Sequence, residues 1–308
     1  MTQKINGIVA VCGGVNIDIG GQSFAPLRER DSNPGRVHMS LGGVGRNIAH
    51  NLRLLGAPVE LLTALGDDLY AGEVERSCAA LGIGLEHALR VQRGRTSTYL
   101  FVSDADGDMA LAVSDMAICD ELTAAYFDAQ RETLDAAALV VADANLPEEA
   151  LAYLAETVRA PLFVDPVSVA KAGKLRGILG RIHTLKPNRL EAELLSGVTI
   201  TDRSSAERAA RELLSRGVRR VFLSLGTKGL LAAQEGQMLW QPPVHADVLS
   251  ATGAGDAMMA ALAWAHLRGS DLRQSAALGA AAAALAIESE ETINPAMCAE
   301  AILSRAQG

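Results

Sequence analysis

The sequence predicts an α/β protein with a doubly wound, mostly parallel sheet and a small antiparallel β lid. Short apolar runs alternate with amphipathic segments along most of the chain, and that order is typical of a parallel sheet with helices on both faces. Two stretches, residues 20–40 and 87–113, break the rhythm with short alternating runs. The chain has 308 residues, of which 49% are apolar, so it can bury a large core without disulfides or a metal. We therefore expect one domain over residues 1–308, with both stretches inserted as a lid.

The elements of the main sheet follow from simple patterns. Residues 8–12 form an apolar run of strand type that ends at two glycines. Apolar residues then recur every three or four positions over residues 44–55, which predicts a helix that ends at Gly56. Residues 59–64 predict the next strand and residues 70–81 the next helix. Further along, we predict strands at residues 139–142, 162–165 and 220–225, and helices at residues 147–158, 190–196 and 206–216. Another helical pattern follows Gly255 and extends to about residue 267.

The two lid segments contain strand signals and few helix signals. Alternating runs occur at residues 37–39, 97–102 and 109–113. Residues 104–108, with the sequence DADGD, are a candidate hairpin turn between two of these runs. Because both segments follow early strands, we expect them to meet in space as one antiparallel sheet.

Composition and charge argue against several classes of protein. The net charge is −8, from 28 basic and 36 acidic side chains, so the chain lacks the basic character of a protein that binds polymeric nucleic acid. The four cysteines are scattered and form no metal-binding or redox pair. Residues 1–4 do not resemble a signal peptide, and the longest apolar stretch, residues 276–287, is too short to span a membrane. We expect a cytoplasmic protein with a small-molecule ligand and no membrane partner.

The strongest chemical signal is the segment Ala251–Ala260, which reads ATGAGDAMMA. Gly253, Ala254 and Gly255 precede a helical pattern, and small residues at a helix start let backbone N–H groups point at a bound anion. Asp256 follows in the first turn, where the helix end should keep its carboxylate ionised and able to accept a proton from a hydroxyl group. Phosphoryl transfer needs this combination of an anion site and a base. An ordinary glycine turn with an acidic cap is the alternative.

Two further segments predict contacts with a ligand that carries hydroxyl groups. Gly43 and Asn47 belong to a glycine-rich helix start, LGGVGRNIA, in which Asn47 lies in the first turn. Asn16 and Asp18 follow the first strand and are two residues apart, so they can face the same side and bind neighbouring hydroxyls. A structural glycine turn and an Asx-rich turn are the respective alternatives.

The second half of the chain carries candidate residues for a nucleotide. Asn188 and Glu191 are three residues apart at a predicted helix start, a spacing that suits a hydrated Mg²⁺ but also a helix-capping box. A glycine turn that suits nucleotide phosphates or ribose follows the strand at 220–225. Its candidate residues are Ser224, Gly226, Thr227, Lys228 and Gly229. No G-x-x-x-x-G-K-[ST] sequence occurs, so the chain is not a P-loop kinase.

In their order and spacing, these segments resemble the ribokinase-like carbohydrate kinases of the phosphofructokinase-B type over nearly the whole chain. Gly42–Ala49 is similar to the first motif of that family and Ala251–Ala260 to the second, which is highly specific. The resemblance implies a ribokinase-like fold, ATP as phosphoryl donor, Mg²⁺, and a nucleoside or sugar as acceptor. It also implies a homodimer formed through the lid.

The same resemblance implies a role for each candidate residue. Asp256 would be the base, and Gly253, Ala254 and Gly255 the anion hole. The acceptor would be held by Asn16, Asp18, Gly43 and Asn47. Asp115 and either Asp143 or Asn145 would complete the sugar end of the pocket. Ser32 and Asn33 of the lid would contact a nucleobase. Mg-ATP would be held by Asn188, by residues 224–229, and by Glu191 through water to the metal. Ser250 stands where many members have an acidic residue that helps to bind K⁺, which puts activation by K⁺ in doubt.

Two alternatives come from other functional classes. A non-catalytic sugar or nucleoside sensor on the same scaffold would need neither the anion-binding turn nor the base. A nicotinamide oxidoreductase would need a G-x-G-x-x-G fingerprint after the first strand and an acidic residue about twenty positions further on. The sequence has neither feature, which disfavours the oxidoreductase.

Overall fold

The computed structural model describes residues 7–307. Residues 1–4, on which the expectation about a signal peptide rests, lie outside that range. Eight of the described strands form the main sheet, in the order β14-β13-β12-β11-β10-β9-β1-β4. The pairs from β12 to β4 are parallel, and β13 and β14 add an antiparallel hairpin at one edge. The bounds are Val9–Cys12 (β1), Val59–Leu62 (β4), Leu139–Asp143 (β9), Leu162–Asp165 (β10), Thr184–Leu185 (β11), Arg220–Ser224 (β12), Leu230–Gln234 (β13) and Gln237–Gln241 (β14).

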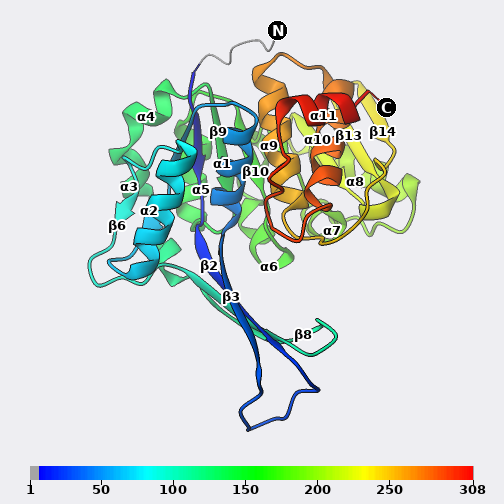
Figure 1. Cartoon of the computed structure of the whole chain (residues 1–308). Coiled ribbons are helices and arrows are strands. Elements are labelled where there is room, and N and C mark those ends of the chain that lie inside the picture. Colours follow the sequence, from blue (N-terminus) through cyan, green and yellow to red (C-terminus); the bar gives the residue numbers. More distant parts are fainter. Residues whose placement is uncertain (1–6, 308) are drawn as a thin grey trace.

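Helices cover both faces of this sheet (Figure 1). One face carries Val44–Leu54 (α1), Leu69–Leu81 (α2), Ala254–Leu267 (α9), Leu272–Ala286 (α10) and Ala299–Arg305 (α11). The other carries Ala124–Ala129 (α3), Arg131–Ala136 (α4), Glu148–Thr157 (α5), Val169–Ala172 (α6), Arg189–Ser196 (α7) and Arg203–Ser215 (α8). Along β1, Val9 and Val11 pack into the first layer, and Ala10 and Cys12 into the second, as the alternation of side chains in a strand requires. The predicted fold class is confirmed.

Some element boundaries differ from those predicted. The strand expected over residues 59–64 ends at Leu62, and Ala64–Leu65 (β5) pairs with Leu89–Arg90 (β6) in a separate two-stranded sheet. The helix expected from residue 206 begins at Arg203, because Asp202 caps it from outside. Short 3₁₀ turns lie at Ala117–Glu121, Gly173–Leu175, Leu179–Arg181 and Gly226–Lys228. No helix within residues 7–307 is long and apolar enough to cross a membrane.

The lid is a four-stranded sheet that projects from the body (Figure 1). Its strands are Asn16–Ser23 (β2), Gly35–Gly42 (β3), Thr98–Ser103 (β7) and Met109–Asp115 (β8), in the order β3-β2-β7-β8. The two outer pairs are antiparallel hairpins, as expected. The central pair, β2 with β7, is parallel, because both strands leave the body in the same direction. The two inserted segments therefore meet as predicted, with one parallel pairing in the middle.

The two faces of the lid differ in character. On the inner face, Gly20 lies beside His38 and Phe101 in the strand register. The opposite face, which we name the outer lid face, is apolar and exposed to solvent. It is formed by Val37, Met39, Leu100, Leu111 and Val113.

Candidate active site

The candidate site lies at the carboxyl ends of the central parallel strands. The strand order reverses between β1 and β9, since the chain passes from β1 to β4 on one side and later returns to β9 on the other. Ligands of open α/β sheets bind in the crevice at such a reversal. Asp143 at the end of β9 accepts a hydrogen bond from the N–H of Gly14 over 2.9 Å, so this carboxylate holds the loop that follows β1. Asn145, the alternative candidate, accepts a hydrogen bond from Lys171.

One hydrogen bond joins the two motif segments. Asn47 lies in the first turn of α1 and Asp256 in the first turn of α9. The side-chain amide of Asn47 donates to Oδ2 of Asp256 over 2.9 Å. Asn47 is only 5% exposed, so neighbouring atoms hold the amide in place. The starts of α1 and α9 thus meet at the carboxylate that the sequence predicts as the base.

The turn before α9 has the geometry of an anion site. Gly253 is the N-cap residue of α9 and has a φ of +81°. A Cβ at this position would overlap the carbonyl oxygen of Thr292, so only glycine fits. Among the residues that the structure describes, no partner accepts a hydrogen bond from the N–H groups of residues 253–256, as is usual for the first turn of a helix. These donors are available to a bound anion.

Lys186 brings a positive charge to the same turn. Its Nζ lies 3.0 Å from the position that a Cβ of Gly255 would occupy and 3.1 Å from Oδ2 of Asp165. Both side chains of this ion pair are buried. Burial alone would lower the pKa of Lys186, but Asp165, Asp256 and Glu191 outweigh it and raise that pKa. Lys186 directly precedes the Pro187-Asn188 helix start but is not among the site residues expected from the sequence.

The protonation of Asp256 differs from the expectation. Burial raises the pKa of Asp256 to about 7, and the nearby carboxylates of Asp165 and Asp143 act in the same direction. The hydrogen bond from Asn47 and the charge of Lys186 lower the pKa without cancelling the increase. The prediction that the helix end keeps this carboxylate fully ionised is therefore wrong near neutral pH. A base whose pKa lies near the working pH is well suited to proton transfer.

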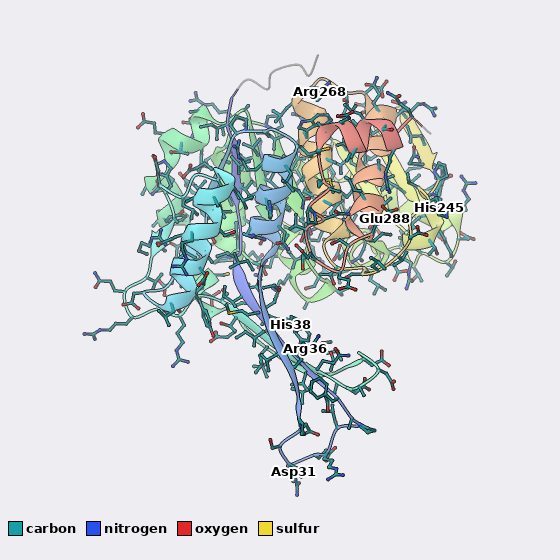
Figure 2. The ribbon with its side chains drawn as sticks, viewed as in Figure 1. Asp31, Arg36, His38, His245, Arg268 and Glu288 are labelled. Carbon is teal, nitrogen blue, oxygen red and sulfur yellow. The ribbon has the colours of Figure 1, made fainter. Side chains whose placement is uncertain are left out.

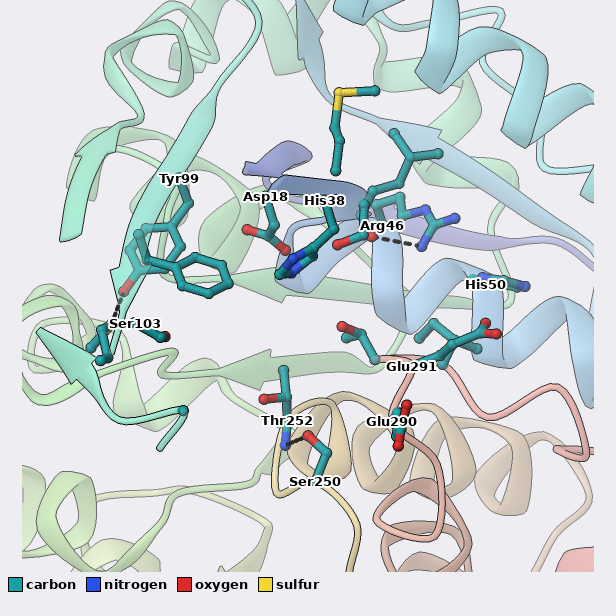
Figure 3. A pocket seen from close by; sticks show the side chains of 18 residues that line it. Asp18, His38, Arg46, His50, Tyr99, Ser103, Ser250, Thr252, Glu290 and Glu291 are labelled. Atoms are coloured by element: carbon teal, nitrogen blue, oxygen red, sulfur yellow. Dashed lines mark hydrogen bonds between the residues drawn. The ribbon is translucent and has the colours of Figure 1, made fainter. Parts of the chain in front are cut away.

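A cavity of about 870 Å³ lies between the lid and the body, and Arg46 of α1 and Ser250 and Thr252 before α9 are among its lining residues. We name it the acceptor cavity. Figure 3 shows Asp18, His38 and Tyr99 of the lid facing Ser250 and Thr252 of the loop before α9. Asn16 donates a hydrogen bond to Oδ1 of Asp18 over 2.6 Å, so the predicted polar pair is present. Burial raises the pKa of Asp18, against the opposing effects of Asn16, Arg46 and His38.

Arg46 is a further residue of this cavity, and the candidate residues from the sequence did not include it. It is 6% exposed, and its Nε has no hydrogen-bond partner among the described residues. Nη1 donates to the carbonyl of Leu41 over 3.3 Å, and Nη2 donates to the hydroxyl of Ser77 over 3.1 Å. Its place directly before Asn47 in the glycine-rich helix start was the one available signal.

Of the residues predicted to hold the acceptor, only Asp18 lines this cavity. Asn16 and Asn47 do not line it and are hydrogen-bonded to Asp18 and Asp256, respectively. Gly43 is the N-cap residue of α1, with a φ of +98°, and packs against the loop that follows β1. Ser32 and Asn33 lie in the loop at the far tip of the lid, next to Asp31 in Figure 2, and neither lines the cavity. Asp115 pairs with Thr98 at the end of β8 on the face opposite His38 and also does not line it.

A second cavity of about 1090 Å³ matches the predicted nucleotide end. Four of the predicted residues line it, namely Asn188, Ser224, Gly226 and Lys228. Thr227 and Gly229 belong to the same turn but do not line the cavity. Leu225, Ile200, Trp240 and Pro242 supply apolar surface, which suits the planar base of a nucleotide. Trp240 is held by a hydrogen bond from its Nε1 to Glu207 over 3.0 Å.

The residues beside the nucleotide cavity are compatible with Mg²⁺. Oε1 and Oε2 of Glu191 each accept a 2.8 Å hydrogen bond from Asn188, so the capping box that the sequence left open is present. Residues 7–307 contain no group of three or more His, Cys, Asp or Glu side chains that could hold a metal ion. Mg²⁺ needs only one or two carboxylates, because water and phosphate oxygens complete its shell. Asp165, whose Oδ2 lies 3.1 Å from Nζ of Lys186, and Glu191 supply two carboxylates for this purpose.

Comparison with known proteins places the chain among kinases. The model of the family described as "pfkB family carbohydrate kinase" matches residues 8–298. The chain is 39% identical over 298 residues to the pseudouridine kinase of Escherichia coli K12. This alignment covers 96% of this chain and 95% of the relative. The chain is 38% identical to an uncharacterized sugar kinase of the same organism, covering 96% of this chain and 82% of the relative.

A solved structure shows the same fold. Arabidopsis thaliana ribokinase complexed with ribose and ATP has a TM-score of 0.87 to this chain, covering 98% of this chain and 99% of that one. Its sequence identity is 22%, so the likeness concerns the fold alone.

Proposed function

The chain belongs to the pfkB family of carbohydrate kinases and is a phosphotransferase with an alcohol acceptor, and we propose that it phosphorylates the 5′-hydroxyl of pseudouridine with ATP. The main structural support for phosphoryl transfer with Asp256 as the base is the 2.9 Å hydrogen bond between Asn47 and Asp256. It joins the predicted base to α1 at the start of α9, the helix whose first N–H groups can hold a phosphate. Arg46, next to Asn47, and Thr252, four residues before Asp256, line the acceptor cavity.

In this proposal Asp256 accepts the proton of the acceptor hydroxyl while that oxygen attacks the γ-phosphorus of ATP. The bond between the γ-phosphorus and the bridging oxygen breaks, and ADP leaves. The N–H groups of Gly253, Ala254 and Gly255 donate to the oxygens of the migrating phosphoryl group, and Lys186 adds its positive charge beside them. This arrangement supplies the positioning and charge stabilisation on which phosphoryl transfer depends.

The nucleotide occupies the second cavity. Asn188, Ser224 and the turn at residues 226–229 lie along its phosphates and ribose, and the apolar surface around Trp240 takes the base. Glu191, through water, and Asp165 would hold Mg²⁺. When bound, the metal neutralises charge on the phosphate oxygens.

Sequence likeness supports pseudouridine as the acceptor. The segments Asp31–Gly35, Arg46–Asn47, His183–Glu193 and Gly255–Met259 resemble those of bacterial pseudouridine kinase, in line with the 39% identity to the enzyme of E. coli. The alternatives are a kinase for uridine, inosine or ribose, and a sensor that binds such a ligand without turnover. The anion-binding turn and the base disfavour the sensor, because binding alone requires neither.

We also propose that two copies associate through the outer lid face. Its five apolar residues are exposed on a sheet that extends away from the body, and exposed apolar patches of this kind mark sites of protein association. A second copy of the chain provides an identical apolar face, so a two-fold arrangement buries both.

An ATP-consumption screen over pseudouridine, uridine, inosine and ribose tests the acceptor. We expect kcat/KM to be highest for pseudouridine and the product to be its 5′-phosphate. Turnover of ribose without turnover of pseudouridine would contradict pseudouridine as the acceptor and would support phosphoryl transfer from ATP. Binding of pseudouridine without consumption of ATP would favour the sensor.

A further inference from the structure

We propose that His38, Tyr99 and Phe101, on the inner face of the lid, form a stacking site for the planar base of a nucleoside acceptor. The inference rests on the proposed function and deepens it, since it assigns recognition of the base to these side chains. It moves that recognition from the loop at the tip of the lid to the sheet surface above the acceptor cavity.

Strand register brings the three rings together. Gly20 of β2 pairs with His38 of β3 on one side and with Phe101 of β7 on the other, and Tyr99 lies two residues before Phe101 on the same face. The ring centroids of His38 and Phe101 are 5.7 Å apart at an interplanar angle of 70°, and those of Tyr99 and Phe101 are 5.9 Å apart at 36°. The three rings therefore form one continuous aromatic surface, which we name the lid platform.

Gly20 makes the lid platform possible. A Cβ at this position would overlap the ring of His38 and the ring of Phe101, so any other residue would push the two rings apart. Gly20 has no positive φ, and its backbone conformation does not require glycine. The space taken by the two rings is the reason for glycine at this site.

The lid platform lies where the base of a nucleoside would be. All three side chains line the acceptor cavity, together with Asp18 and Arg46 near the base of the lid. Asp18 and Asn16 are suited to sugar hydroxyls, and Asp256 marks the hydroxyl that reacts. A group attached to the sugar at the carbon remote from the reacting hydroxyl then extends along the lid, toward the rings.

The chemistry of the platform favours a planar ligand. A pentose has no planar face, so aromatic rings offer it little beyond general apolar contact. A nucleobase stacks on aromatic side chains, and each such contact contributes substantially to affinity. If the rings only formed cross-strand pairs that stabilise the lid sheet, replacing one of them would not weaken the binding of a nucleoside in particular.

The residues at the tip of the lid are already engaged in their own loop. The side-chain carbonyl of Asn33 accepts a hydrogen bond from the N–H of Arg28 over 2.8 Å, and its amide donates to the carbonyl of Arg28 over 3.0 Å. The N–H of Ser32 donates to the side chain of Asp31 over 2.8 Å. These hydrogen bonds hold Asn33 within its own loop. The lid platform, in contrast, lines the acceptor cavity.

The test compares Phe101→Leu with Phe24→Leu. Phe24 is also on the lid and is 68% exposed, but it does not line the cavity, so the second variant removes an aromatic ring without touching the platform. We expect Phe101→Leu to raise the Kd and KM for pseudouridine about tenfold, in line with the loss of one stacking contact. kcat should change little, because Phe101 does not contact the reacting atoms. The Kd for ribose should stay within about twofold of wild type.

A second variant keeps the inference testable if Phe101→Leu does not fold. Phe101→Trp retains a ring and adds a fluorophore to the platform, and Phe24→Trp serves as its control. With nucleotide concentration held constant, pseudouridine should quench the fluorescence of Phe101→Trp, whereas ribose should not.

The possible failures can be told apart. Unchanged pseudouridine affinity in Phe101→Leu, or no quenching in Phe101→Trp, would overturn the role of the lid platform. The proposed function would still stand if the wild-type enzyme phosphorylated pseudouridine. A wild-type enzyme that phosphorylates ribose and no nucleoside would overturn the proposed acceptor, and the platform with it.

Discussion

Four charged side chains determine the electrostatics around the proposed base. Asp143, Asp165 and Asp256 supply three carboxyl groups, and Lys186 is the cation among them. Burial raises the pKa of Asp143 to about 6 and that of Asp256 to about 7, and carboxylate repulsion adds to both. Without nucleotide, the cluster therefore holds protons at a pH where isolated carboxyl groups hold none. Burial is the largest cause of both shifts, so the protonation of the cluster near neutral pH depends on its depth in the fold.

This arrangement predicts an acid limb in the activity of the enzyme. Protonated Asp256 cannot accept the proton of the acceptor, and protonation increases as the pH falls through about 7. We expect kcat/KM to be constant above about pH 8 and to fall about tenfold per pH unit below about pH 6. A pH–rate profile between pH 5 and 9 measures this directly. A profile that stays flat down to pH 5 would show that a different group, or none, acts as the base.

Asp256→Asn provides the matched comparison at fixed pH. The amide has nearly the same shape and cannot accept the proton, so we expect kcat to fall by about 10² or more. Binding of the acceptor should remain measurable by calorimetry, because Asn16, Asp18 and Asn47 are unchanged. Activity near the wild-type level in this variant would be incompatible with the assigned base.

At the scale of elements, α7 and α10 begin in the same way. Asn188 and Glu191 form a capping box at the start of α7, and Asp271 and Gln274 form one at the start of α10. Only the first box borders the nucleotide cavity. The geometry of a capping box therefore does not by itself indicate a ligand site, and the two helices offer a test of whether Asn188 has a second role.

We predict equal losses of stability and unequal losses of function in Asn188→Ala and Asp271→Ala. Each substitution removes an N-cap, which costs about 1 kcal/mol and should lower Tm by about 2–4 °C. Asn188→Ala should in addition raise the KM for ATP about tenfold through the loss of a polar contact. Calorimetry and steady-state kinetics on both variants supply the measurements. Equal KM values for ATP would restrict Asn188 to capping α7.

Elements with strong local patterns were predictable from the sequence. The spacing of apolar residues in α1 and the glycines around α9 are local signals, and both helices form where predicted. The hairpin of β13 and β14 was missed, because its pairing at the sheet edge depends on β12. The parallel pairing of β2 with β7 was missed for a similar reason, since it joins segments about 80 residues apart in the chain.

The site shows the same division between local and long-range information. Residues with a motif around them, such as Asn47 and Asp256, could be named in advance. Lys186 could not, because its importance comes from the ion pair with Asp165 and from its position beside Gly255, and both contacts depend on the tertiary fold. The raised pKa of Asp256 also depends on the tertiary fold, because burial is its largest cause and the carboxylates of Asp165 and Asp143 add to it.

At the scale of the whole molecule, the lid connects substrate binding with association. Its inner face carries the lid platform and borders the acceptor cavity, while its outer face is apolar. Because alternate residues of one strand face opposite sides, His38 lies between Val37 and Met39 of the outer face. A contact on one side of this thin sheet can therefore stabilise the positions of the side chains on the other.

The outer lid face should tolerate a charge in the monomer but not in a dimer. A carboxylate at Val37, which is 75% exposed, should cost the monomer little but would be buried against the partner in a lid dimer, where an unpaired charge is strongly unfavourable. We expect wild-type protein to sediment as a dimer at micromolar concentration and Val37→Asp/Val113→Asp to sediment as a monomer. Leu69→Asp is the control, since Leu69 is 90% exposed at the start of α2 and is not part of the lid sheet, and this variant should remain dimeric. A monomeric wild type, or a dimer that tolerates both lid carboxylates, would exclude association through this face.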